Sequence, residues 1–148
     1  MEVFLGRQLA KTDKAVRAEF DARLSEAGGS LTTWIVLRSA GESTSQRELA
    51  DRMGVEGPTL VRHIDRLERE GLIERHRDPL DRRVTRIVVT VAGQQMLAQL
   101  AVVAAEMDAN VRAALGDDAY AGLMAGLQRL HAYAGCLAEE RKAHAAAH

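Results

Sequence analysis

Apolar residues repeat at helical spacing along most of this chain. Three segments, residues 3–26, 92–114 and 117–142, set apolar side chains three or four positions apart with polar residues between them, which predicts long amphipathic helices. The repeating residues are Leu5, Leu9, Val16, Phe20 and Leu24, then Leu97, Leu100, Ala104, Met107 and Val111, and finally Leu123, Leu127, Leu130, Ala134 and Leu137. One small domain cannot bury the apolar surface of all three stripes. We therefore expect the helices at about 3–26 and 92–142 to pack against a second copy of the chain.

Two short helices are predicted within residues 31–54. The first covers residues 31–40, with Thr32 or Thr33 as its N-cap and Trp34 facing inward, and a polar turn at 41–44 follows it. The sequence Ser45-Gln46-Arg47-Glu48 has the S-x-x-E form of a capping box, in which the hydroxyl and the carboxylate each accept a backbone N–H. The second helix is therefore expected to begin at Ser45 and to end at Gly54, which suits a left-handed C-terminal position.

A further helix is predicted over residues 56–70. Leu60, Ile64 and Leu67 form one buried stripe, and Gly57 and Pro58 are well tolerated in a first helical turn. The opposite side carries Thr59, Arg62, Arg66 and Arg69, with His63 at the flank. This outward face has three guanidinium groups and no acid at its centre, so it suits an anionic partner.

A β-hairpin is predicted after Gly71. Residues 72–75 begin an extended segment, Asp78-Pro79-Leu80-Asp81 supplies a turn, and residues 84–91 alternate, with Ile87, Val89 and Val91 on one face. The charged residues around the tip are Arg75, Arg77, Arg82, Arg83 and Arg86, with Asp78 and Asp81. Five positive charges less two negative charges leave three net positive charges in this hairpin.

Composition favours one mainly helical domain. The 148 residues are 47% hydrophobic but only 3% aromatic, which predicts a mainly α fold with a small β-hairpin wing. We expect a single domain, residues 1–148, whose winged helix-turn-helix core covers about 31–91. The formal net charge is −1, so the case for a nucleic-acid partner rests on local charge. No stretch approaches the roughly 18 apolar residues of a membrane span, which predicts a soluble cytoplasmic protein with no membrane partner.

The arrangement of the middle segment is that of a winged helix-turn-helix. The second helix of such a unit can enter a major groove while the hairpin reaches the adjacent minor groove of double-stranded DNA. From about Leu5 to the final helix, the chain resembles the MarR family of transcriptional regulators, and its SlyA branch most. The resemblance rests on Gln46-Arg47-Glu48-Leu49-Ala50, Pro58-Thr59-Leu60-Val61-Arg62, Leu67-Glu68-Arg69-Glu70-Gly71-Leu72-Ile73 and Asp81-Arg82-Arg83.

The resemblance implies a homodimer on a pseudo-palindromic operator, acting as repressor or activator and modulated by a small aromatic anion. The implied DNA-binding residues are Ser45, Gln46, Pro58, Thr59, Arg62, His63, Arg66, Arg82 and Arg83. Arg83 takes the place of the wing arginine that enters the minor groove, and Asp81 takes that of the acid that orients the wing. His63 and Leu80 depart from the family pattern, because a small polar residue and a more polar wing residue are expected there.

Two alternatives to the DNA-binding interpretation stay open. Arg62 alone would be a solvated helix face, and Arg83 with Asp81 would be a surface ion pair of about 0–1 kcal/mol. A dimeric protein-interaction module could also keep a winged-helix fold without any operator. Steep weakening of binding with rising salt distinguishes DNA binding from that module.

Other residues offer weaker signals. By resemblance, Arg17 and Trp34 lie near the effector pocket, where a cation beside an indole suits an aromatic carboxylate; ordinary surface and core roles are equally open for them. Cys136, the single cysteine, excludes an intramolecular disulfide and is expected to be a buried, inert thiol. His144 and His148 have the i, i+4 spacing of a metal pair but lie in a tail expected to fray after residue 142. No catalytic constellation is present, so we predict no enzyme, no metal site and no cofactor.

Overall fold

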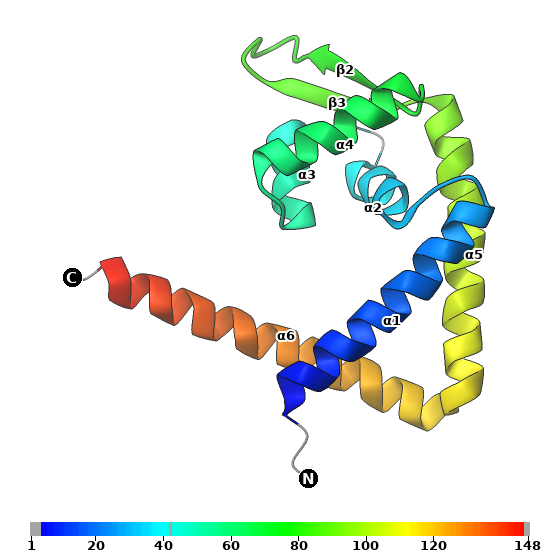
Figure 1. Ribbon diagram of the computed structural model, residues 1–148. Coiled ribbons are helices and arrows are strands. Elements are labelled where there is room, and N and C mark those ends of the chain that lie inside the picture. Colours follow the sequence, from blue (N-terminus) through cyan, green and yellow to red (C-terminus); the bar gives the residue numbers. More distant parts are fainter. Residues whose placement is uncertain (1–3, 42, 147–148) are drawn as a thin grey trace. The chain divides into compact units, whose positions relative to one another are not determined.

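A computed structural model of the protein describes residues 4–41 and 43–146 (Figure 1). Along the chain lie α1 (Leu5–Glu26), α2 (Leu31–Ala40), β1 (Ser43–Ser45), α3 (Gln46–Met53), α4 (Gly57–Arg69), β2 (Ile73–Arg77), β3 (Thr85–Val89), α5 (Val91–Leu115) and α6 (Asp117–Ala146). The chain divides into two compact units, one ending at Ala105 and the other beginning at Glu106. The predicted class, a mainly α winged helix with a small β wing and long terminal helices, is confirmed.

One hydrophobic core holds the first unit together. It joins α2, α3, α4 and the sheet, and the predicted stripe of Leu60, Ile64 and Leu67 lies fully buried in it. Leu37 from α2 and Leu49 from α3 are equally buried. Burial of a leucine or isoleucine side chain stabilises a fold by about 1.5–3 kcal/mol, so this core fixes the direction in which the opposite face of α4 points.

The sheet has a strand that the sequence analysis missed. Its order is β1-β3-β2, with both neighbours antiparallel to β3. Residues 43–45 pair with β3, although the sequence placed 43 and 44 in a polar turn; Thr44 lies opposite Ile87 and is buried. A strand of three residues has too few positions for a period-two pattern, and its pairing depends on a partner more than forty residues away. The expected turn is therefore wrong at this point.

The end of β3 also differs from the prediction. The strand ends at Val89, whereas Val91 is the first residue of α5 and is exposed, so its expected place on the inner face of the strand is wrong. Thr90 turns the chain, because its hydroxyl donates to the Gly71 carbonyl at 2.7 Å and accepts from the Gly93 N–H at 3.0 Å. This side chain therefore joins the strand end to the helix start.

Local signals located the ends of α3 correctly. Ser45 Oγ accepts from the Glu48 N–H at 3.1 Å, and the Glu48 carboxylate accepts from the Ser45 N–H at 3.0 Å, which completes the capping box. Gly54 closes the helix in the left-handed conformation, with a φ of 63°. The cap of α2 was assigned wrongly, because Ser30 and not Thr32 or Thr33 accepts from the Thr33 N–H.

The long helices expose apolar side chains. In α1 only Leu24 is buried, while Leu5 and Val16 are exposed, and α6 buries none of its described residues. The tail does not fray after residue 142 as expected, because α6 continues to Ala146; His148 lies outside the described residues. None of the described helices is long and apolar enough to cross a membrane.

Candidate nucleic-acid interface

The first half of α4 is open to solvent on one side. Gly57, Pro58, Thr59 and Arg62 are exposed, and His63 is half-buried at the flank. The backbone enters this helix from an extended Glu56 whose side chain makes no capping bond, and a proline lies in the first turn. The unpaired N–H groups of a helix start carry partial positive charge. This end of α4 therefore combines a guanidinium, a hydroxyl and an imidazole with a surface that a ligand can approach closely.

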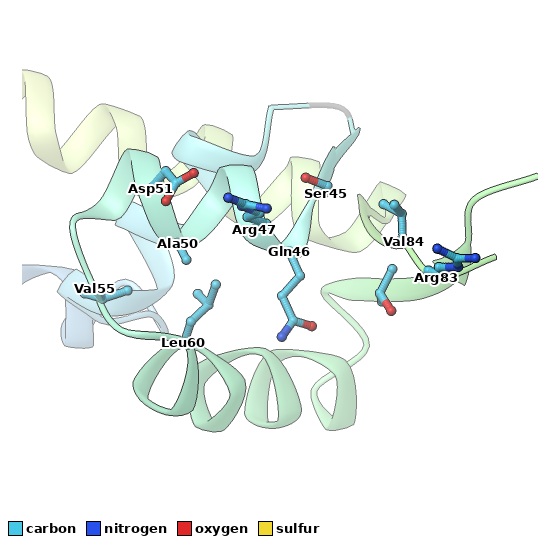
Figure 2. Close-up of a pocket in the computed structure, with 11 residues that line it drawn as sticks. Ser45, Gln46, Arg47, Ala50, Asp51, Val55, Leu60, Arg83 and Val84 are labelled. Atoms are coloured by element: carbon cyan, nitrogen blue, oxygen red, sulfur yellow. The ribbon is translucent and has the colours of Figure 1, made fainter. Parts of the chain in front are cut away.

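A groove of about 680 Å³ adjoins the start of α4. It lies between α3, α4 and the start of β3 beside the wing turn, and Figure 2 shows Gln46 extending from the start of α3 toward α4, with Arg83 on the hairpin side. Ser45, Gln46 and Arg83, which the sequence analysis assigned to one binding surface, thus line one groove. Arg47 and Asp51 also line it. Arg47 was not among the residues that the sequence assigned to this surface, although it lies in the first turn of the capped helix, where free N–H groups suit an anion.

The wing turn is built around a buried carboxylate that the sequence analysis treated only as a turn residue. Asp78 accepts hydrogen bonds from the Leu80 N–H at 2.8 Å and the Asp81 N–H at 3.2 Å, and it pairs with the Arg86 guanidinium. The Leu80 N–H, the Arg86 guanidinium and the Asp81 N–H hold the pKa of the Asp78 carboxyl below its usual value. Asp78 therefore orders the backbone on which the tip residues stand.

Asp81 contacts the backbone of Arg83 and not its guanidinium. Its carboxylate accepts from the Arg83 N–H at 3.0 Å, and its carbonyl accepts from the Val84 N–H at 2.9 Å. Among the ion pairs of the described residues, none involves Asp81, Arg82 or Arg83. Both arginines are exposed at the wing, so the surface ion pair considered as an alternative is not formed.

Arg75, in the middle of β2, binds α4. Its guanidinium donates to Glu68 at 3.0 Å and also bonds Asp65, and its backbone N–H donates to Glu68 at 3.2 Å. The hydrogen bond that its guanidinium donates to Asp65 is the main cause that raises the pKa of Arg75. Arg75 therefore fastens the hairpin to α4. The charge count from the sequence included Arg75 among the positive charges of the tip, but its charge is paired with Asp65 and Glu68.

Arg66 was expected on the outward face of α4, and the structure corrects this. Its guanidinium donates to Ser30 Oγ at 3.2 Å and to Thr33 Oγ1 at 3.0 Å, both at the start of α2. Glu70 lies 3.7 Å away and forms an ion pair with it. Helical periodicity places Arg66 away from the core, but the start of α2 lies against this part of α4 and engages the side chain.

Arg17 and Trp34, which the resemblance places near one effector pocket, each have a different partner in the structure. Arg17 pairs with Asp13, four residues earlier on the same exposed helix face. The cation over the Trp34 indole is Arg38, with its Cζ 5.0 Å from the ring centroid, and Phe20 meets the other ring edge at 5.4 Å between centroids. The ion pair with Asp13 agrees with the ordinary surface role that stayed open for Arg17.

Cys136 is exposed on α6 and not buried as expected. It lies on a helix with no buried side chain among its described residues, and the described part of the chain leaves the thiol exposed.

Comparisons with known proteins agree with this geometry. The MarR family matches residues 30–85. The structure is similar to that of the transcriptional regulator PA3341, with 38% sequence identity, a TM-score of 0.75, and coverage of 89% of this chain and 98% of that chain. It is also similar to an S. aureus MepR–DNA complex, with 19% identity, a TM-score of 0.81, and coverage of 89% and 99%. A mutant of MarR from E. coli complexed with operator DNA has 24% identity, a TM-score of 0.79, and coverage of 85% and 92%.

Proposed function

This chain belongs to the MarR family of transcriptional regulators, and we propose that it acts as a homodimer on a pseudo-palindromic DNA operator. As a member of that family it is a regulator and not an enzyme. The observation that carries the proposal is the groove lined by Gln46, Arg47 and Arg83, directly beside the open start of α4. One unit thus presents a helix suited to a major groove and a basic hairpin suited to a minor groove.

The proposed DNA contacts are of two kinds: some recognise bases, and others position the domain on the DNA backbone. Thr59, Arg62 and His63 face the bases of the major groove, and a bidentate bond from Arg62 to guanine contributes about 1–3 kcal/mol of discrimination. Arg82 and Arg83 enter the minor groove, and Gln46 and Arg47 bind phosphate, which positions the domain without reading sequence. Ser45 acts through the capping box that orients Gln46 and Arg47.

The proposed dimer explains the exposed apolar residues of the long helices. Side chains such as Leu5 on α1 and Leu127 on α6 are exposed in the single chain. Large exposed apolar surfaces on a regulator mark an interface, and a two-fold dimer would match a two-fold symmetric operator. Within the family, we place the chain nearest the SlyA branch on the wording of its recognition helix and wing.

A small aromatic anion is the proposed effector, with Trp34 and Arg38 as its site. The indole N–H of Trp34 is buried and has no hydrogen-bond partner among the described residues, and Arg38 supplies a cation over the ring. An aromatic carboxylate would satisfy both groups. Tryptophan fluorescence titrated with salicylate, with Arg38→Ala as the comparison, tests this part.

Selection of bound sequences from random DNA at physiological salt tests the main proposal. A two-fold symmetric motif with half-sites about 10–10.5 bp apart is expected. Arg62→Ala combined with Arg83→Ala should abolish binding to that motif and leave the fold and the dimer intact. Arg69→Ala is the matched control, because it removes an arginine from the far end of the same helix. It should cost little affinity.

Two results would contradict the proposal. The first is wild-type affinity in the double variant, which would refute the site. The second is the absence of any salt-sensitive binding to DNA, which would favour a protein-interaction module.

A further inference from the structure

The tip of the wing exposes a single large apolar side chain. Leu80 is 97% exposed, more than any other large hydrophobic residue among those the structure describes. An exposed leucine within a helix face can be covered by a partner helix, but this one stands at the end of a hairpin. Nothing in the packing of the chain requires leucine there.

The turn holds Leu80 in a defined position. Its N–H donates to the buried Asp78 carboxylate at 2.8 Å, and Pro79 restricts the backbone before it. The same carboxylate binds the Asp81 N–H and the Arg86 guanidinium, and the Asp78 N–H donates to the Val84 carbonyl at 2.9 Å. The leucine is therefore presented on an ordered backbone and not on a loose loop.

The surroundings of Leu80 are basic. Arg82 and Arg83 follow it, and no acidic side chain of the described residues pairs with either. Arg77 lies across the turn and donates to the Arg82 carbonyl at 3.2 Å. Of the two acids that flank Pro79 and Leu80, Asp78 is buried and already binds Arg86, and Asp81 is exposed and accepts a hydrogen bond from the Arg83 N–H at 3.0 Å. An apolar point amid guanidinium groups is suited to the minor groove, whose negative potential attracts arginines and whose base steps accept an apolar wedge.

We propose that Leu80 inserts as an apolar wedge at a base step in the minor groove and kinks the operator there. This rests on the proposed function and adds a further specificity residue to it. Pyrimidine–purine steps such as TA and CA unstack most easily, so the wing should prefer such a step although it forms no hydrogen bond to it. The basic neighbours bring the tip into the groove, and burial of the leucine stabilises the opened step.

The test uses the selected operator with 2-aminopurine beside the step that the wing reaches. Binding of the wild-type protein should raise the fluorescence, because the base loses its stacking partner, and should bend the fragment in electrophoretic phasing. Leu80→Asn should remove both signals and weaken binding roughly tenfold at a TA step. Leu80→Met keeps an apolar wedge and should preserve them. Since Leu80 packs against nothing, thermal melting should be the same for all three proteins.

Failure of this inference is distinguishable from failure of the proposed function. If Leu80→Asn bends and unstacks the operator like the wild type, or if Leu80→Met fails as Leu80→Asn does, the wedge is wrong while operator binding stands. If the wild type binds no DNA, both proposals fall. A preference for TA over GC at the wing step that disappears in Leu80→Asn supports the wedge.

Discussion

Replacing Arg75 with methionine removes the link between the wing and the recognition helix α4. Methionine keeps a long, largely apolar side chain but no donor, so Asp65 and Glu68 lose their shared guanidinium. The side chains are 28% exposed for Arg75, 48% for Asp65 and 41% for Glu68. They are neither fully solvated nor deeply buried. Solvent therefore screens these ion pairs in part but does not cancel them.

The expected loss of stability follows from this exposure. Each part-exposed pair contributes up to about 1 kcal/mol, and one guanidinium serves two carboxylates, so the free energy of unfolding should fall by about 1–2 kcal/mol. For a chain of this length, that lowers the melting temperature by about 3–6 °C. Without the link, the wing is no longer held in position before it meets DNA. Operator affinity should fall about fivefold, the cost of ordering the wing on binding.

Thermal melting and fluorescence anisotropy at several salt concentrations measure these effects. Arg75→Lys keeps the charge but not the two-pronged geometry, and should lie between the wild type and Arg75→Met. Arg77→Met is the matched control, since Arg77 stands on the same strand and donates only to the Arg82 carbonyl. It should leave the melting temperature nearly unchanged.

The salt dependence decides between fastening and direct contact. If Arg75 only fastens the wing, Arg75→Met should weaken binding without changing the slope of log affinity against log salt. A slope smaller by about one would mean that Arg75 itself binds a phosphate, which would refute the reasoning. Unchanged melting together with unchanged affinity would show that the link has no consequence.

Three further predictions concern the elements around the site. Ser45→Ala removes the N-cap acceptor of α3 and should lower stability by about 1 kcal/mol in urea denaturation. In Gly93→Ala the new Cβ would lie 2.0 Å from the Leu72 carbonyl oxygen, so a loss of about 2 kcal/mol or more is expected; Gly57→Ala, with nothing within 4 Å, should melt like the wild type. Because the folded pKa of Asp78 is depressed, its stabilisation is present above its unfolded pKa of about 3.9 and lost as pH falls through the folded value. Melting curves between pH 3 and 5 should thus depend less on pH in Asp78→Asn.

Features of the fold that depend on neighbouring residues could be predicted from the sequence. The capping box at Ser45, the left-handed Gly54 and the buried stripe on α4 each follow from the conformational preferences of a few adjacent residues. Features that depend on distant packing could not. The strand at 43–45 forms only because β3 lies beside it, and Arg66 leaves the outward face of α4 only because Ser30 and Thr33 lie within reach of its guanidinium.

The same distinction between local and distant contacts holds for the candidate site. Periodicity correctly placed Thr59 and Arg62 on the open side of α4, since the core fixes the opposite side. It could not show that Asp78 is the buried carboxylate of the wing turn while Asp81 stays exposed and bonds the Arg83 N–H, because two acids flanking Pro79-Leu80 look equivalent in sequence. Only the position of Arg86 on the adjoining strand distinguishes them.

The corrected position of Arg66 indicates how α4 is used along its length. Arg66 binds the start of α2, and Asp65 and Glu68 bind Arg75 of the wing, so the second half of the helix is fastened on two sides. The first half makes no such contacts on its outer side and carries Thr59 and Arg62. The residues proposed to read the bases and the residues that fasten the helix therefore occupy successive turns of α4. A shift of α2 would be transmitted through Arg66 to the first half of α4, because a packed helix moves as a rigid element.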